Sequence, residues 1–134
     1  MLLSLVDIQS RVEDLARRID APPGDLPTFG QCEDGARPHI EVGGEYHFVV
    51  VERGSELRRS STNDLDELLY WVFSGVASKM ASRFELRNRR HGEDFRRQMF
   101  SRRLELLNLL SPAWAEKEKA RLDEIPSRHP FQDR

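Results

Sequence analysis

The segment His39-Ile-Glu-Val-Gly-Gly-Glu-Tyr-His-Phe-Val-Val-Val-Glu52 decides the fold of this chain. Its second half is the most β-prone stretch of the sequence, because aromatic and β-branched side chains favour strands. Gly43-Gly44 separates the two halves, and glycine supplies the positive φ values that a two-residue hairpin turn needs. The pattern predicts a β-hairpin in which Ile40 faces His47 and Glu41 faces Tyr46.

The sequence after this hairpin continues the sheet and then changes to helical periodicity. Arg53-Gly54 predicts a second turn, and Glu56–Ser60 predicts a third antiparallel strand. From residue 64 to 89, apolar side chains recur every three or four positions, which predicts a long helix. Helices are also predicted near 93–110 and over 112–125, where Pro126 ends the pattern.

The sequence before the hairpin predicts one helix and a long loop. Residues 4–20 carry a single apolar stripe, whereas residues 21–37 are broken by proline and glycine and show no period. The expected fold class is therefore α+β: an N-terminal helix, a three-stranded antiparallel meander, then three helices packed on the sheet. We expect one domain over residues 1–134, with residues 127–134 as an extended tail.

Length and composition exclude several classes of protein. The chain has 134 residues and a net charge of −2, so as a whole it is neither a strongly basic nucleic-acid binder nor a strongly acidic mimic. A single cysteine, Cys32, excludes an internal disulfide framework and a cysteine-based zinc site. The N-terminal segment does not have the pattern of a signal peptide, and no apolar run is long enough to span a bilayer. We expect a cytoplasmic protein with no membrane partner.

Charge is distributed unevenly along the chain. Residues 1–56 carry 5 basic and 11 acidic side chains, whereas residues 83–103 carry eight arginines and three acids. Arginine binds phosphate oxygens well, so residues 83–103 are a candidate phosphate-binding region. Acids are interleaved with these arginines and no aromatic stacking pattern accompanies them, which favours a solvated helix pair with internal salt bridges.

The remaining candidate chemistry has simpler structural explanations. Strand alternation in the predicted register places His39 and Glu41 on one face and His47 on the other, so no metal site is expected. Asp64, Asp66 and Glu67 begin a helix, where carboxylates suit the positive end of the helix dipole. No GxSxG, P-loop, HExxH or GxGxxG motif occurs. We therefore expect no catalytic residues, no cofactor and no enzyme activity.

Several strings of the sequence resemble the immunity protein family numbered 63 of bacterial polymorphic toxin systems. They are Pro-His-Ile-Glu at 38–41, Tyr-His-Phe-Val-Val-Val-Glu-Arg-Gly at 46–54, Thr-Asn-Asp-Leu-Asp-Glu-Leu-Leu-Tyr-Trp-Val-Phe at 62–73, Leu-Ser-Pro-Ala-Trp-Ala-Glu at 110–116 and His-Pro-Phe at 129–131. The resemblance implies a cytoplasmic protein that neutralises a cognate toxin domain by direct contact, commonly by occluding its active site.

A partner-binding surface follows from the acidic front half of the chain. Net negative charge would steer a basic toxin such as a nuclease, and Tyr and Trp are frequent anchors of protein interfaces. The predicted contact residues are Glu41, Glu45, Tyr46, Glu52, Arg53, Asp64, Asp66, Glu67 and Trp71. For Glu52 and Arg53, a meander turn held by local pairing is the favoured explanation over toxin contact. The competing function is a protein-interaction adaptor, or a nucleic-acid-binding module that uses residues 83–103.

Overall fold

A computed structural model describes residues 1–133 of the chain, which divide into two compact units. The first unit runs from Met1 to Phe73 and the second begins at Ser74. Helix α2 (Leu65–Arg87) contains the boundary, so its first nine residues belong to the first unit and the rest to the second. None of the helices among the described residues is long and apolar enough to cross a membrane.

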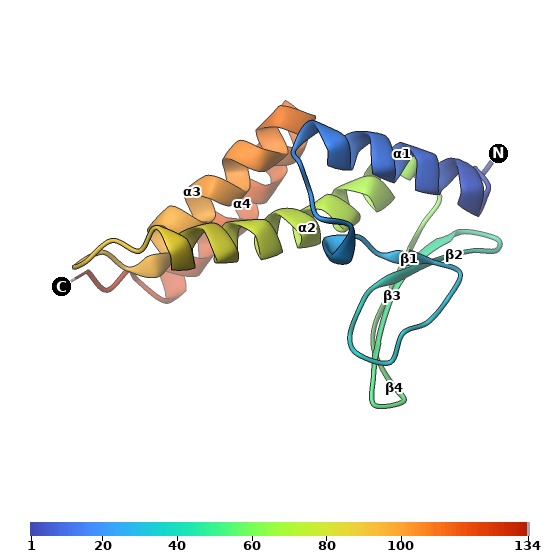
Figure 1. Cartoon of the computed structure of the whole chain (residues 1–134), viewed down its shortest axis with the longest axis horizontal. Coiled ribbons are helices and arrows are strands. Elements are labelled where there is room, and N and C mark those ends of the chain that lie inside the picture. The colour runs from blue at the N-terminus through green and yellow to red at the C-terminus, as the bar shows by residue number, and fades with distance from the viewer. Residues whose placement is uncertain (134) are drawn as a thin grey trace. The chain divides into compact units, whose positions relative to one another are not determined.

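The first unit combines one helix with a four-stranded sheet (Figure 1). Its elements before α2 are α1 (Leu5–Arg18), the short 3₁₀ helix η1 (Pro23–Asp25), β1 (Thr28–Phe29), β2 (His39–Val42), β3 (Tyr46–Glu52) and β4 (Ser55–Thr62). The strand order is β1-β2-β3-β4, with β1 parallel to β2 and the other neighbours antiparallel. The α+β class and the antiparallel β2-β3-β4 meander are confirmed.

The prediction of only three strands was wrong, because the predicted loop over residues 21–37 contains η1 and β1. Thr28 and Phe29 pair with His39 and Ile40, so the chain crosses over and returns in the same direction. Gly30, with φ of 78°, lets the chain leave β1 directly after this pair. Two residues are too few to produce a period-2 pattern, which explains why the sequence did not indicate the strand.

The hairpin register also differs from the prediction by one residue. Gly43, Gly44 and Glu45 all lie in the connection, so Ile40 pairs with Phe48 and Glu41 pairs with His47. A one-residue slip moves side chains of one strand to the opposite face relative to its neighbour. His39, Glu41 and His47 therefore share one face of the sheet, and the prediction of opposite faces was wrong.

The turn predicted at Arg53-Gly54 is confirmed. Both residues have positive φ, 53° and 76°, as a two-residue hairpin turn of the type I′ class requires. Asp34 supports the turn from outside: its backbone oxygen accepts from the Arg53 N–H and its carboxylate from the Gly54 N–H, at 3.2 and 2.6 Å. An arginine with positive φ is unfavourable by itself, so the Asp34 contacts help hold it.

The core of the first unit consists of buried apolar side chains from α1, β2, β3 and the first nine residues of α2. Helix α1 packs beside β2, and its buried residues repeat at helical spacing. The Tyr46 hydroxyl accepts a hydrogen bond from the Leu3 N–H at 2.7 Å, which fixes the segment before α1 to the sheet. The buried apolar side chains of this unit are Ile8, Val12, Ala16, Ile19, Ile40, Tyr46, Phe48, Val49, Leu68, Leu69, Tyr70, Val72 and Phe73.

The second unit is helical, with α3 (Phe95–Leu110) and α4 (Pro112–Arg128) side by side (Figure 1). Ser111 caps α4 by accepting from the Trp114 N–H, and Trp114 is buried. Helix α4 does not stop at Pro126 but includes it in its last turn. Phe95, an apolar residue at the start of α3, is 51% exposed, whereas Gln98 on the same helix is buried.

The predicted extended tail begins at Ser127, but the helix continues to Arg128 and the irregular segment starts at His129. Arg134, its last residue, lies outside the described residues. The predicted packing of the three later helices on the sheet stays a prediction.

Candidate functional site

The outer face of the sheet carries a chain of hydrogen-bonded charges across β2 and β4. Glu41 accepts from the His39 ring Nε2 at 2.7 Å and from the Arg59 guanidinium at 3.2 Å, and Arg59 also donates to Glu56 at 2.5 Å. The bond from His39, and then the bond from Arg59, hold the pKa of Glu41 below its ordinary value. Glu41 is therefore a fixed, ionised carboxylate on a half-exposed surface.

His39 and His47 serve this face as hydrogen-bond partners. His39 is buried and donates through Nε2 to Glu41, while its second ring nitrogen, Nδ1, has no hydrogen-bond partner within residues 1–133. His47 bonds through Nδ1 to the Ser61 hydroxyl on β4 at 2.6 Å. No group of three or more His, Cys, Asp or Glu side chains within residues 1–133 is arranged to hold a metal ion.

The predicted contact residues of the hairpins differ in accessibility. Glu45 and Glu52 are exposed at the two ends of β3, and Arg53 is exposed in the turn that follows. Tyr46, by contrast, is 2% exposed, and its hydroxyl is engaged by Leu3. Tyr46 thus supports the surface from below, while the three charged residues lie on it.

The remaining predicted contact residues lie at the start of α2. Asp64 accepts from the Asp66 N–H at 3.0 Å, so it caps a free amide of the first turn. Glu67 accepts from the Thr62 hydroxyl at 3.3 Å, which joins the end of β4 to the helix. Trp71, one turn further on, is half-buried. These acids therefore have a structural role at the helix start, and Asp64 and Asp66 are also exposed.

Sequence reasoning missed that β4 contributes to the same region. The Arg58 guanidinium lies 4.7 Å from the centre of the Phe48 ring and 5.7 Å from that of Trp71. Such cation–π contacts hold Arg58 over the apolar face of the sheet. Neighbouring residues of a strand point to opposite faces, so Arg59 joins the Glu41 chain while Arg58 meets Trp71. The sequence predicts these opposite orientations of Arg58 and Arg59 once the segment is assigned to a strand.

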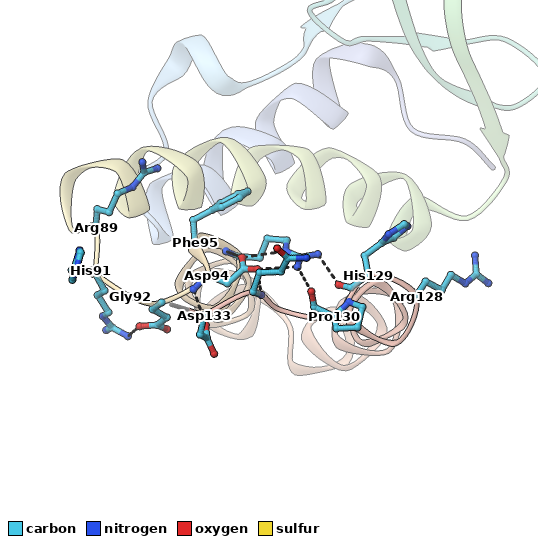
Figure 2. A pocket seen from close by; sticks show the side chains of 13 residues that line it. Arg89, His91, Gly92, Asp94, Phe95, Arg128, His129, Pro130 and Asp133 are labelled. Atoms are coloured by element: carbon cyan, nitrogen blue, oxygen red, sulfur yellow. Dashed lines mark hydrogen bonds and ion pairs between the residues drawn. The ribbon is translucent and has the colours of Figure 1, made fainter.

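A second polar cluster lies in the helical unit, in a cleft of about 1020 Å³ (Figure 2). Residues 89–96 line one side, and residues 128–130, 132 and 133 line the other. Figure 2 shows Arg89 and His91 at one end of the cleft, Arg128 and His129 at the other, and a hydrogen-bonded centre around Asp94. Basic side chains border the cleft, but they do not converge on a single point.

The centre of the cleft is a strap, residues 129–133, fastened to the start of α3. Asp94 caps the helix and accepts from the Gln132 N–H at 2.7 Å. Arg96 donates to Asp94 and to the carbonyl oxygens of His129 and Pro130, and Asp133 accepts from the Asp94 N–H at 2.8 Å. The bond from Arg96, aided by the backbone N–H donors, holds the pKa of Asp94 well below its usual range.

The aromatic residue of the strap is also held. Phe131 lies under the Arg97 guanidinium, 4.2 Å from ring centre to carbon, and 6.3 Å from the Phe100 ring centre. Arg97 also binds the Asp133 carboxylate at 3.0 Å. The polar groups at the centre of the cleft thus form hydrogen bonds with one another. These bonds hold the C-terminal segment against the start of α3.

The arginines of residues 83–103 are largely paired with acids. Ion pairs join Arg89 to Glu85, Arg90 to Glu93, Arg96 to Asp94, Arg97 to Asp133, Arg102 to Glu105 and Arg103 to Glu118. Arg102 also lies over the Phe84 ring at 4.7 Å. This is the internal salt-bridge arrangement that interleaved charges predict, and it leaves less of the positive charge for phosphates.

One of these pairs is buried. Glu118 is 0% exposed and binds the Arg103 Nε at 3.0 Å, the Ser74 hydroxyl at 2.5 Å and the Arg121 Nε at 2.8 Å. Arg103 also donates to the hydroxyls of Ser74 and Ser78, at 3.2 Å each. Glu118 lies in the polar sequence Ala-Glu-Lys-Glu-Lys, which is typical of a solvent-exposed helix face. The local pattern therefore gave no indication that this carboxylate is buried.

These features define a small mixed α+β protein whose first unit carries a fixed, mostly acidic surface around a sheet. Residues 43–124, well over half of the chain, match the model of the family described as Immunity protein 63. The chain therefore belongs to the Immunity protein 63 family. Comparisons with curated proteins and with solved structures found no match.

Proposed function

We propose that this chain is an immunity protein that binds a cognate bacterial toxin domain directly and neutralises it without catalysis, in the cytoplasm of the cell that makes it. Membership of the Immunity protein 63 family carries this proposal, since the family's description names an immunity role. Neutralisation by contact needs a rigid scaffold, a fixed pattern of charge and a few anchor side chains.

The surface we propose for toxin binding follows the two ends and the outer face of the hairpins. Its charged members are Glu41, Glu45, Glu52, Arg53, Asp64, Asp66 and Glu67, and Tyr46 is the buried support. Trp71, its aromatic member, lies on the opposite face of the sheet, where Arg58 contacts it. Six of the seven charged side chains are acidic, so the surface favours a partner with a basic face, such as a nuclease. Hydrogen bonds within the chain already fix the carboxylates of Glu41 and Asp64. Such side chains lose little conformational entropy when a partner binds, which favours binding.

Glu45 and Glu52 are the best positions for a test. Both are exposed, and the structure gives neither carboxylate a partner among residues 1–133. The double variant Glu45→Lys/Glu52→Lys therefore changes the surface charge and leaves the fold contacts in place. The matched control is Glu116→Lys/Glu124→Lys, which makes the same change in net charge on exposed positions of α4.

The measurement is the association rate with the cognate toxin domain, sought among the genes adjacent to the one for this chain, at low and at high salt. We expect the hairpin variant to associate at least about tenfold more slowly at low salt, and the difference to shrink when salt screens the charges. The α4 control should stay within about twofold of the unmodified chain. Equal rates for both variants at low salt would refute the placement, and absence of any complex with the unmodified chain would refute the function.

A further inference from the structure

The outer edge of β4 is an open strand edge in the middle of the proposed binding surface. β4 is the last strand of the sheet, and no strand within residues 1–133 pairs with its outer side. Five consecutive residues, Ser55–Arg59, are exposed, and Leu57 is 59% exposed. An open edge presents unpaired backbone N–H and C=O groups that are satisfied by water or by another strand.

Of the two edges of the sheet that residues 1–133 form, the edge at β4 is the longer. β1, at the other side of the sheet, has two residues, whereas β4 has eight. The pairing of β3 with β4 is irregular between Val50 and Val51 but regular from Arg58 to Thr62. Since Thr62 is buried, the accessible regular stretch is Arg58–Ser61, with Leu57 at the irregularity.

The predicted contact residues lie around this edge. Glu52 and Arg53 immediately precede β4, and Asp64 and Asp66 follow it. Glu41 lies on β2, with β3 between it and β4, and is joined to β4 by the Arg59 guanidinium. Trp71 is connected to it on the opposite face through Arg58. Acids outnumber bases around the edge, so the fitting partner is an extended segment flanked by lysine or arginine.

We propose that β4 binds the toxin by strand addition: an extended segment of the toxin, flanked by basic residues, pairs with the outer edge of β4 and continues the sheet. This inference rests on the proposed function and specifies how the contact is made. Main-chain hydrogen bonds provide the pairing, and the charges at the two ends of β4 select a basic partner.

Proline substitutions at Arg58 and at Arg59, made one at a time, test whether the backbone N–H groups of the β4 edge bind the toxin. In an antiparallel ladder, successive residues alternate between pairing inward with β3 and presenting their N–H outward, so one of Arg58 and Arg59 presents its N–H at the free edge. Proline removes that N–H and blocks the incoming strand, and it is tolerated at an edge when the lost N–H faces solvent. The matched controls are Arg58→Ala and Arg59→Ala, which remove the side chains and keep the N–H groups.

We expect one of the two proline variants to keep its fold, as measured by circular dichroism. That variant should bind the cognate toxin domain at least about tenfold more weakly than its alanine control. Hydrogen–deuterium exchange of the unmodified chain provides a second readout. Amides of residues 55–61 should exchange quickly in the free chain and slowly in the toxin complex.

Failure of this inference is distinguishable from failure of the proposed function. If the toxin domain binds, but each folded proline variant equals its alanine control or residues 55–61 gain no protection, strand addition is wrong and the immunity function stands. If both proline variants unfold, the exchange result alone decides. Pairing of β4 with a second copy of this chain, seen as dimers by sedimentation that persist when toxin is added, would also overturn it.

Discussion

Replacing Glu118 by alanine should destabilise the helical unit strongly. The carboxylate of Glu118 is fully buried and bound to Arg103 and Ser74, while Arg103 itself is only 12% exposed. Alanine removes the negative charge and leaves the Arg103 guanidinium buried without it. Desolvation of a charge that has lost its partner is the largest expected cost, because water cannot restore the lost interaction.

The magnitude follows from the separate contacts. Breaking one side of a buried ion pair costs about 3–5 kcal/mol. Arg121 is 52% exposed, so its bond to Glu118 adds less than about 1 kcal/mol. A total near 4 kcal/mol lowers the midpoint of thermal unfolding by about 10–20 °C for a chain of this size. Glu116→Ala, at an exposed position of the same helix, is the control and should change stability by less than about 0.5 kcal/mol.

Paired removal of both charges separates the cost of burial from the value of the ion pair. Arg103→Met/Glu118→Met replaces the two ions by apolar side chains, and such replacements are neutral or stabilising by about 1–4 kcal/mol in other proteins. The freed hydroxyl of Ser74 can bond to its own helix backbone. We therefore expect the double variant to be more stable than Glu118→Ala.

Urea unfolding followed by tryptophan fluorescence measures these differences. The chain has two tryptophans, and Trp114 is buried in the helical unit, so the Trp71→Phe background leaves a single reporter there. A Glu118→Ala cost below about 1 kcal/mol would refute the reasoning, because the burial of the pair would then carry no penalty. A double variant no more stable than Glu118→Ala would refute it as well.

Two further predictions concern acid stability and the turn between β3 and β4. Asp94 and Asp133 both have lowered pKa values in the folded chain, so their stabilisation is complete above the ordinary value of 3.8 and is lost as the pH falls below it. Urea titrations from about pH 6 to about pH 2 should show this loss, and Asp94→Asn should make the curve flatter, whereas an unchanged slope would exclude Asp94 as its source. Gly54→Ala, at φ of 76°, should cost about 1 kcal/mol or more in urea midpoint measurements, while Gly24→Ala, whose Cβ meets nothing within 4 Å, should cost nothing. Equal costs for the two glycines would show that backbone strain at Gly54 is not the cause.

The sequence predicts those parts of the fold in which one local pattern extends over many residues. Helix α2 keeps the apolar spacing for more than five turns, and Tyr46–Glu52 is a strand rich in aromatic and β-branched residues; both are where the sequence places them. Arg53-Gly54 is recognised for the same reason, since the turn chemistry is local.

Long-range pairing is where prediction from sequence failed. The register of β2 on β3 depends on whether Glu45 belongs to the turn or to the strand, and the glycines before it allow both. β1 pairs with a strand ten residues further along the chain, and nothing in Thr28 and Phe29 encodes that partner. On the helices, Glu118 is buried and Phe95 is exposed. Their burial depends on contacts with other helices and with the strap, which are distant in the sequence.

The same distinction shows which charges of the two charged regions are paired within the chain and which are not. Residues 83–103 have the highest density of positive charge in the chain, yet acids from up to 36 residues away neutralise much of it, as Asp133 does for Arg97. The acids of the hairpin unit are fixed differently: Glu41 is held by His39 and Arg59 yet stays half-exposed, and Glu45 and Glu52 are exposed with no partner within residues 1–133. A charge acts on a partner only to the extent that its own chain has not neutralised it, and this supports the proposed placement of the contact surface at Glu45 and Glu52.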